Sequence, residues 1–244
     1  MTRQIRIGLF AVSAAGLAAL LLWGVAGLPD FGNYHHAYGR TINAVAVPER
    51  HATNAVTAIV FDYRGFDTLG EEFILFASVM GVALLLRDVR EETRRPRDRV
   101  RSDAVRLAGA GAAAAMLVLG MYVVAHGAIT PGGGFQGGVV LAGAFALLYL
   151  AVEYRGYRSL TPLPALDFVE GLGAGGFAVI GVVALLLGNA YLYNFMPLGT
   201  AGTLASSGTI LMVNLATALE VSAAFVLLFT EFLEELVVTR VQTE

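Results

Sequence analysis

Residues 210–232 read ILMVNLATALEVSAAFVLLFTEF. This apolar stretch has about the 20 residues that an α-helix needs to cross a bilayer, and it carries the carboxylate Glu220 near its middle. A charged group is costly in lipid, so it faces protein or water and often marks an ion path. The stretch therefore predicts a membrane-spanning helix with an ion-handling acid.

Other apolar stretches extend this prediction to the whole chain. Those similar in length to the first are Ile5–Ala26, Arg106–Ala125, Gly134–Val152 and Asp167–Leu187. A further one, Phe73–Leu86, is too short alone and must include residues before Glu72. The chain is 57% hydrophobic and 14% charged, with a mean hydropathy of +0.68, unlike a soluble domain. We predict an all-α, polytopic membrane protein of about six transmembrane helices, with the first retained rather than cleaved as a signal peptide.

Arginine clusters orient these helices, because cytoplasmic loops retain positive charge. The clusters comprise Arg3 and Arg6, then Arg87, Arg90, Arg94, Arg95, Arg97, Arg99, Arg101 and Arg106, and finally Arg155 and Arg158. A six-pass path places all of them, and both termini, on the cytoplasmic side. The external loops are then residues 27–65, 126–133 and 188–209.

The connector from Arg87 to Arg106 also contains acids, namely Asp88, Glu91, Glu92, Asp98 and Asp103. This mixture is typical of a solvated linker rather than a nucleic-acid-binding patch. We expect it to separate two modules, residues 1–100 with two helices and residues 101–244 with four.

Residues 61–72, FDYRGFDTLGEE, are the densest polar sequence next to a predicted span. A helix from about Asp67 places Asp67, Glu71 and Ser78 on one side, with Glu72 about 100° away. The three acids would then line the mouth of the second transmembrane helix. A simpler interpretation is that acids favour the first turn of a helix, where the helix dipole stabilises them.

Residues 126–138, HGAITPGGGFQGG, lie between the third and fourth predicted spans. Thr130 followed by Pro131 predicts a helix start, with threonine as the N-cap. The spacing of Gly133 with Gly137, and of Gly134 with Gly138, favours close packing against another helix. A phosphate-binding loop is excluded, because no Lys-Ser/Thr pair follows the glycines and no strand precedes them.

Histidine is the side chain typically used for proton transfer near neutral pH, so His126 is a candidate for that role at the end of the third span, or else a hydrogen-bonded anchor. The other histidines, His35, His36 and His51, lack the paired spacing of a zinc site. The chain has no cysteine, which excludes disulfides and iron–sulfur clusters. We expect no metal site and no cofactor.

Acids also occur in the last two spans. Asp167 is placed to cap a helix, and Glu170 to act as its capping partner or as a pathway acid. Thr217, Glu220 and Glu231 fall on one stripe of the last helix, although Glu220 alone is also compatible with a buried acid bonded to a neighbouring helix. The chain has no lysine, so a proton relay would use carboxylates and histidine. The candidate ion-pathway residues are Asp67, Glu71, Glu72, His126, Asp167, Glu170, Glu220 and Glu231.

Two segments resemble a known family. Residues 126–138, together with Val213–Val221 and its continuation to Glu231, resemble the MrpB subunit of Mrp-type sodium/proton antiporters. Residues 54–72 resemble the C-terminal end of the large MrpA subunit, a part that is a separate small protein in membrane-bound hydrogenases.

The resemblance implies a fusion of two accessory membrane subunits within a multi-subunit complex of a prokaryotic plasma membrane. Its partners would be other membrane subunits, sodium ions and protons, with no nucleic acid. The resemblance also implies that Asp67, Glu71, His126 and Glu220 occupy polar positions of the ion route.

Several functions remain open. The chain is predicted to be an accessory transport subunit that contributes to a sodium or proton pathway. Alternatively, it is a scaffold that docks antiporter-like subunits, or a component of the ion-pumping module of a membrane-bound hydrogenase or complex-I-like enzyme. We predict no catalytic residues of its own, because no nucleophile, base and orienting group share a motif.

Overall fold

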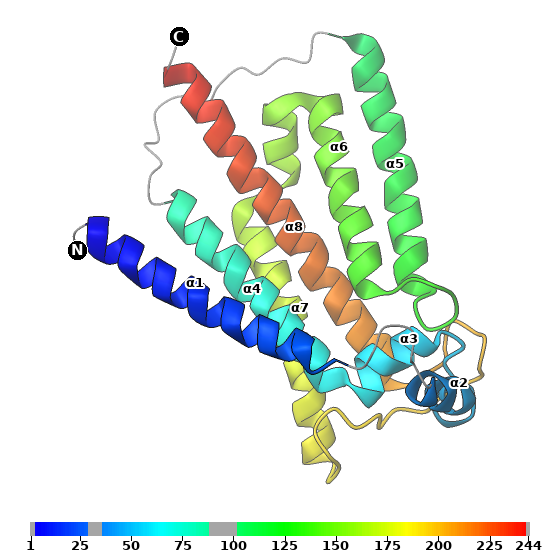
Figure 1. Cartoon of the computed structure of the whole chain (residues 1–244). Helices are drawn as coiled ribbons and strands as arrows, with labels where there is room; N and C mark the ends of the chain where they lie inside the picture. Colours follow the sequence, from blue (N-terminus) through cyan, green and yellow to red (C-terminus); the bar gives the residue numbers. More distant parts are fainter. Residues whose placement is uncertain (1–2, 29–35, 88–101, 243–244) are drawn as a thin grey trace. The chain divides into compact units, whose positions relative to one another are not determined.

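The computed structural model describes residues 3–28, 36–87 and 102–242 (Figure 1). Its elements are the helices α1 (Arg3–Ala26), α2 (Ala37–Arg50) and α3 (Ala55–Ala58), the π-helical turn η1 (Ile59–Tyr63), and the helices α4 (Gly65–Arg87), α5 (Asp103–Ala125), α6 (Gly134–Leu160), α7 (Leu163–Leu186) and α8 (Thr209–Gln242). Six helices of this described part are long and apolar enough to cross a membrane, namely α1 and α4 to α8. The predicted all-α membrane fold is confirmed. Most of the charged connector, residues 88–101, and His35 lie outside the described residues, and the orientation of the termini stays a prediction.

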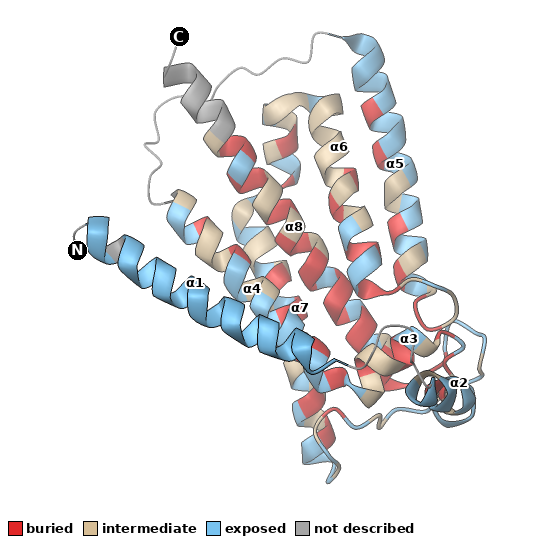
Figure 2. Cartoon of the chain, in the orientation of Figure 1, coloured by how far each residue is buried: buried red, intermediate tan, exposed pale blue. Residues whose placement is uncertain are grey.

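The chain forms two units, one of residues 1–41 and one of residues 42–244. In the first unit, the α1 side chains that the structure describes are exposed along the helix, including Trp23 and Phe10 (Figure 2). A helix that is apolar all round requires lipid or another protein to cover it. The predicted module boundary near residue 100 stays a prediction.

In the second unit, α8 is the central helix and packs against α4, α5, α6 and α7. Buried residues concentrate along it (Figure 2). Small side chains such as Ala216, Ala218 and Ala224 line this helix and let its neighbours approach closely. The end of the α4–α8 bundle next to α3 is called the α3 end below, and the opposite one, where α6 connects to α7, is called the α6–α7 end.

The predicted start of α6 at Thr130 and Pro131 is wrong, because the helix begins at Gly134. Asn54 donates side-chain hydrogen bonds to the carbonyls of Gly127 (2.7 Å) and Thr130 (2.9 Å), which holds this segment outside the helix. Gly133 then adopts a φ of 146°, which favours glycine. Helical geometry starts only where the Gly134 amide donates to Asn214 Oδ1 at 2.6 Å.

The predicted N-cap at Asp167 is also wrong. The cap of α7 is Pro162, and the helix starts at Leu163, so Asp167 lies inside it. Pro164 lies in the first turn of the helix, where proline is favoured because its fixed φ is helical and its missing amide hydrogen is not needed. The short apolar run that ends at Leu86 does borrow earlier residues, as predicted, since α4 begins at Gly65.

Helix α6 extends beyond the predicted end at Val152, but it breaks there. Glu153 has a φ of 61°, a left-handed conformation that is strained for a residue with a side chain. The remaining turns direct Tyr157 and Arg158 toward α8, as their contacts with Thr230 and Glu234 show.

Candidate functional site

Three glutamates and a threonine are buried at the centre of the second unit. Glu72 of α4 is 1% exposed, and Glu170 of α7, Thr217 of α8 and Glu220 of α8 are each 0% exposed. We call these four residues the carboxyl cluster. Gly173 allows α7 to reach α8 here, because a Cβ atom at that position would lie 2.6 Å from Cβ of Glu220.

The side chains of the carboxyl cluster act on one another. Glu72 interacts with Glu220 and with the Thr217 hydroxyl, and Glu220 interacts in turn with Glu170. These groups are adjacent without good hydrogen-bond geometry: Glu72 Oε2, Thr217 Oγ1 and both carboxyl oxygens of Glu220 are enclosed and make no geometrically sound hydrogen bond within the described residues.

The burial of these acids has a chemical consequence. The groups that act on Glu72 and Glu220 are Thr217 and other acids, and the ion pairs found within the described ranges include neither glutamate. Buried charges without a counterion are strongly unfavourable. The buried environment of Glu72 and Glu220 therefore favours protonated carboxyls or the uptake of a cation.

The three carboxyl groups lie at different depths. At 1.5 Å per residue, Glu72 is about 10 Å along α4 from its start at the α3 end, and Glu220 is about 16 Å along α8 from the same end. Helix α7 runs in the opposite direction, and Glu170 is about 10 Å from its start at the α6–α7 end. The three carboxyls therefore lie at successive depths in the bundle, with Glu72 nearest the α3 end, Glu220 next and Glu170 nearest the α6–α7 end.

A cavity of about 240 Å³ reaches this cluster from the α3 end. At about 30 Å³ per molecule, such a volume has room for several waters. We call it the membrane cavity. Its polar lining comes from Thr57, Thr68, Glu71, Glu72, Gln136 and Thr217. Water can therefore approach Glu72 and Thr217 from one end of the bundle.

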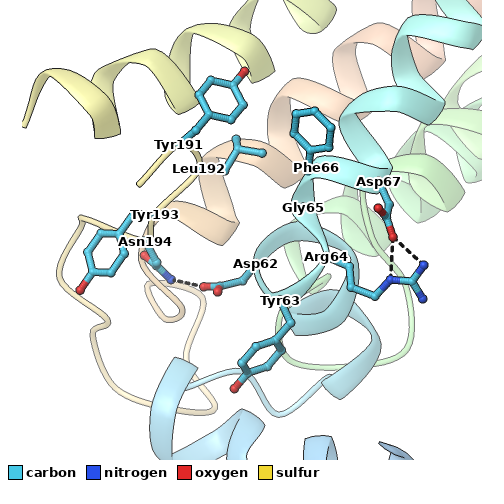
Figure 3. Close-up of a pocket in the computed structure, with 10 residues that line it drawn as sticks. All are labelled: Asp62, Tyr63, Arg64, Gly65, Phe66, Asp67, Tyr191, Leu192, Tyr193 and Asn194. Carbon is cyan, nitrogen blue, oxygen red and sulfur yellow. Dashed lines mark hydrogen bonds and ion pairs between the residues drawn. The ribbon is translucent and has the colours of Figure 1, made fainter. Parts of the chain in front are cut away.

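A second hollow, of about 520 Å³, opens beside the start of α4 and the segment after α7 (Figure 3). Its charged groups already have partners. Asp62 pairs with Arg50 at 2.8 Å and accepts a hydrogen bond from Asn194 at 3.1 Å, while Arg64 pairs with Asp67. This hollow is larger than the membrane cavity, but its interactions hold chain segments together, so it is the weaker candidate for ion binding.

Tyr63, which also lines this hollow, is likewise held by a hydrogen bond within the chain. Its hydroxyl donates to Glu49 Oε2 at 3.0 Å. Burial, followed by the hydrogen bond to Glu49 and the charge of that residue, raises the pKa of Tyr63 to about 12. Tyr63 therefore stays neutral at physiological pH.

A second set of buried polar side chains, besides the carboxyl cluster, lies toward the α6–α7 end of the bundle. The Arg158 guanidinium Nε pairs with Glu234 Oε1 at 2.5 Å, and the hydroxyls of Tyr157 and Thr230 are hydrogen-bonded at 2.8 Å. We call these four residues the arginine cluster. Between it and the carboxyl cluster lies a third, apolar group formed by Val79, Ala224 and Leu227, all at most 1% exposed.

The structure thus brings together three of the predicted pathway residues, Glu72, Glu170 and Glu220. Glu71 is exposed and lines the membrane cavity, whereas Asp67 is exposed and paired with Arg64.

The other predicted pathway residues lie outside the carboxyl cluster. Asp167 is half-buried, one turn before Glu170. Glu231 is buried on α8, next to Thr230 of the arginine cluster. His126 stacks on Tyr122, with ring centroids 4.0 Å apart, and does not contribute to the lining of the membrane cavity. The pathway roles of these residues stay predictions.

The sequence-based site omitted Thr217, Gln136 and Asn214. Thr217 lies one turn before Glu220, a spacing that was visible in the polar stripe. Asn214 donates to the Val124 carbonyl at 2.8 Å and accepts from Gly134, so it joins α8, α5 and α6. Nothing local in the sequence indicates that it contacts Gly134.

The predicted packing glycines of α6 lie in close contacts. A Cβ atom at Gly134 would meet Ala218 and Thr217 of α8 at 3.0 Å, and one at Gly138 would meet Val221 at 2.9 Å. Gly137 instead lies against Val124 of α5. In the described part of the chain, no group of three or more histidines and acids is arranged to hold a metal ion.

Comparison with protein families identifies the chain. Residues 104–227 match the domain related to the MnhB subunit of Na+/H+ antiporters, and residues 2–102 match MbhE, a subunit of MBH. The chain belongs to the MnhB-related family.

Individual relatives agree with this assignment. The MnhB-related chain is 32% identical over 210 residues to an uncharacterized protein of Methanocaldococcus jannaschii, covering 75% of this chain and 78% of that one. It is 35% identical over 80 residues to the putative antiporter subunit mnhB2 of Staphylococcus haemolyticus, a match that covers 32% of this chain and 55% of that protein.

Solved structures with the same fold belong to membrane complexes. A chain of the archaeal membrane-bound sulfane sulfur reductase, a respiratory membrane complex, superposes with a TM-score of 0.71 at 30% identity, covering 94% of this chain and 98% of that one. A chain of the Mrp complex of a Dietzia species gives a TM-score of 0.66 at 21% identity, covering 95% of this chain and 26% of that one, and shows the fold alone.

These findings establish the setting of the protein. It is a multi-pass protein of a prokaryotic plasma membrane and a membrane subunit of a cation-antiporter-like complex, with other membrane subunits as its partners. The family assignment places it among transport subunits rather than catalytic ones.

Proposed function

We propose that this chain supplies part of a proton pathway within an antiporter-like complex, with Glu220 as its central group. The observation that carries the proposal is the carboxyl cluster, in which acids from three helices are buried together and stepped in depth. Chains of intramembrane acids are typical of proton relays in pumps and transporters.

The order of transfer follows from the contacts. Water in the membrane cavity exchanges a proton with Glu72, whose neighbours are Glu220 and the Thr217 hydroxyl. Glu220 passes the proton to Glu170 on the opposite helix. Asp167, one turn closer to the α6–α7 end, is the next acceptor. Protons suit this arrangement better than sodium, since they need only adjacent oxygens, whereas a dehydrated cation requires several oxygens that converge on one point.

The direct test is Glu220→Gln, which keeps the size of the side chain and removes its titration. Sodium-dependent proton exchange is measured in inverted vesicles that contain the whole complex, after assembly has been checked by co-purification. We expect normal assembly and exchange at the background level of vesicles without the complex. Asp103→Asn, at an exposed acid at the start of α5, serves as the control and should not change the rate.

Unchanged exchange in an intact Glu220→Gln complex would contradict this proposal. A scaffold function would then be the better conclusion. An observation that independently favours scaffolding is α1, whose exposed apolar surface is available to neighbouring subunits or lipid.

The alternative setting is a redox-driven complex. It is supported by the 30% identical chain of the archaeal respiratory complex. Co-purification of redox subunits with this chain would favour that setting, whereas co-purification of antiporter subunits alone would favour sodium/proton exchange. The proposed pathway is compatible with both.

A further inference from the structure

We propose that the open side of the membrane cavity is closed by a transmembrane helix of another subunit, which presents a basic side chain to Glu71. The inference rests on the proposed function for the role of the cavity, but the contact itself is argued from the surface of α4 and α6. Exposed polar groups, glycine positions and charge all contribute to it.

Two exposed polar groups lie on candidate membrane-spanning helices beside the membrane cavity. Glu71 of α4 and Gln136 of α6 both lie within membrane-spanning helices, both line the membrane cavity, and both are exposed. Lipid chains at this position would meet a carboxyl and an amide for which no hydrogen-bond partner is found among the described residues, which is costly. A protein surface with polar groups is the favourable cover.

The glycines of α4 share this surface. Gly70, Ala77 and Gly81 lie with Glu71 and Ser78 within about 120° of the helix circumference. A Cβ atom at Gly70 or Gly81 would meet nothing within 4 Å. Within the unit of residues 42–244, this side of α4 is therefore open to a close approach by a further helix.

The glycines of α6 behave differently. Cβ atoms at Gly137 and Gly138 would collide with Val124 and Val221. The α6 glycines are therefore used for packing within this chain, whereas those of α4 leave space that a further helix can enter closely.

The charge of this surface is negative. Asp67, one turn before Glu71, is already paired with Arg64. The ion pairs found among the described residues do not include Glu71, which is exposed, whereas its neighbour Glu72 points into the buried carboxyl cluster. A lysine, arginine or histidine on the covering helix would complement the Glu71 carboxylate and would set the position of that helix.

The test is site-specific photo-crosslinking in the whole complex, in native membranes. A photoreactive amino acid replaces Ala77 on the proposed surface or, as a control, Leu107 on the exposed face of α5. We expect the probe at Ala77 to attach to a membrane span of another subunit that carries a basic residue, and the probe at Leu107 to give no such product. Attachment at Ala77 only to lipid, or only to the same chain, would overturn the proposal.

Matched glycine substitutions give an independent measurement. Gly81→Leu fills the proposed contact, and Gly111→Leu adds the same side chain to an equally open position of α5. We expect Gly81→Leu to give about tenfold lower recovery of the cross-linked partner, as the loss of a close helix contact implies, and Gly111→Leu to leave it unchanged. Equal recovery of that partner with both variants would contradict the interface.

The two proposals fail separately. Glu220→Gln tests the proton pathway and should leave recovery of the neighbouring protein intact. Glu71→Gln removes the charge on the proposed surface and should weaken recovery. If Glu220→Gln abolishes exchange while Ala77 contacts only lipid, the pathway stands and the interface is wrong. If Ala77 contacts another protein of the complex while Glu220→Gln transports normally, the interface stands and the pathway is wrong.

Discussion

Two of the buried glutamates of helix α8, Glu220 and Glu234, have different surroundings. Glu234 faces the guanidinium of Arg158 at 2.5 Å, so its charge is compensated within the chain. Glu220 is at least as deeply buried, but its neighbours are the acids Glu72 and Glu170. The same side chain on the same helix thus has two environments: Glu234 faces a fixed cation, whereas Glu220 faces other acids, which is why we propose that Glu220 binds a mobile proton.

The apolar residues between the carboxyl cluster and the arginine cluster keep them separate. Val79, Ala224 and Leu227 are buried, and Leu75, Leu163, Leu166 and Leu228 pack against them. Water and ions enter such a layer only at high cost. In the proposed pathway, a proton on Glu220 is therefore expected to pass to Glu170 rather than along α8 toward Glu234.

The largest effect is expected from breaking the compensated pair. Arg158→Ala leaves the Glu234 carboxylate buried without its cation, which should cost about 3–5 kcal/mol of stability. Denaturant titration of the purified complex measures this loss. Adding Glu234→Gln should restore most of the stability, because no unpaired charge then remains. A double variant as unstable as Arg158→Ala would contradict a charge-based explanation.

The comparison also separates what the sequence reveals from what only packing decides. Glu220 could be predicted because a single acid in a long apolar run is a local signal. Its contact with Glu72 could not, since the helical period fixes the direction of Glu72 relative to Glu71 but not which helix it meets. Likewise, the ion pair of Arg158 with Glu234 could not be predicted, because the break at Glu153 that turns Arg158 toward α8 has no local sequence signal. The cytoplasmic location of Arg158 stays a prediction.

The starts of α6 and α7 illustrate the same limit. The Thr130–Pro131 pair is a good local start signal, yet hydrogen bonds from Asn54 and to Asn214 move the start to Gly134. These asparagines are distant in sequence from the segment that they control. Hydropathy, by contrast, depends on a single stretch at a time, so the membrane spans could be predicted correctly.

An intermediate effect is expected from opening the apolar layer. Leu227→Asn removes a buried leucine side chain, a change that costs about 2–5 kcal/mol when the replacement is alanine, and it places an amide between the two polar clusters. We expect a passive proton leak in vesicles without a sodium gradient. Leu219→Asn, at an exposed position of α8, is the matched control and should not leak. A tight Leu227→Asn complex would show that the layer does not separate the clusters.

The smallest effect on stability, and the most specific one on transport, is expected at Thr217. Its hydroxyl is buried, interacts with Glu72 and borders the membrane cavity. Thr217→Val keeps the shape of the side chain and removes the hydroxyl, so unfolding should change by no more than about 1 kcal/mol. Proton exchange should fall if the hydroxyl passes protons between water and the carboxyl cluster, and Thr217→Ser should restore it. If valine and serine variants exchange protons equally well, Thr217 only fills space, and the transfer between Glu72 and Glu220 must be direct or through water.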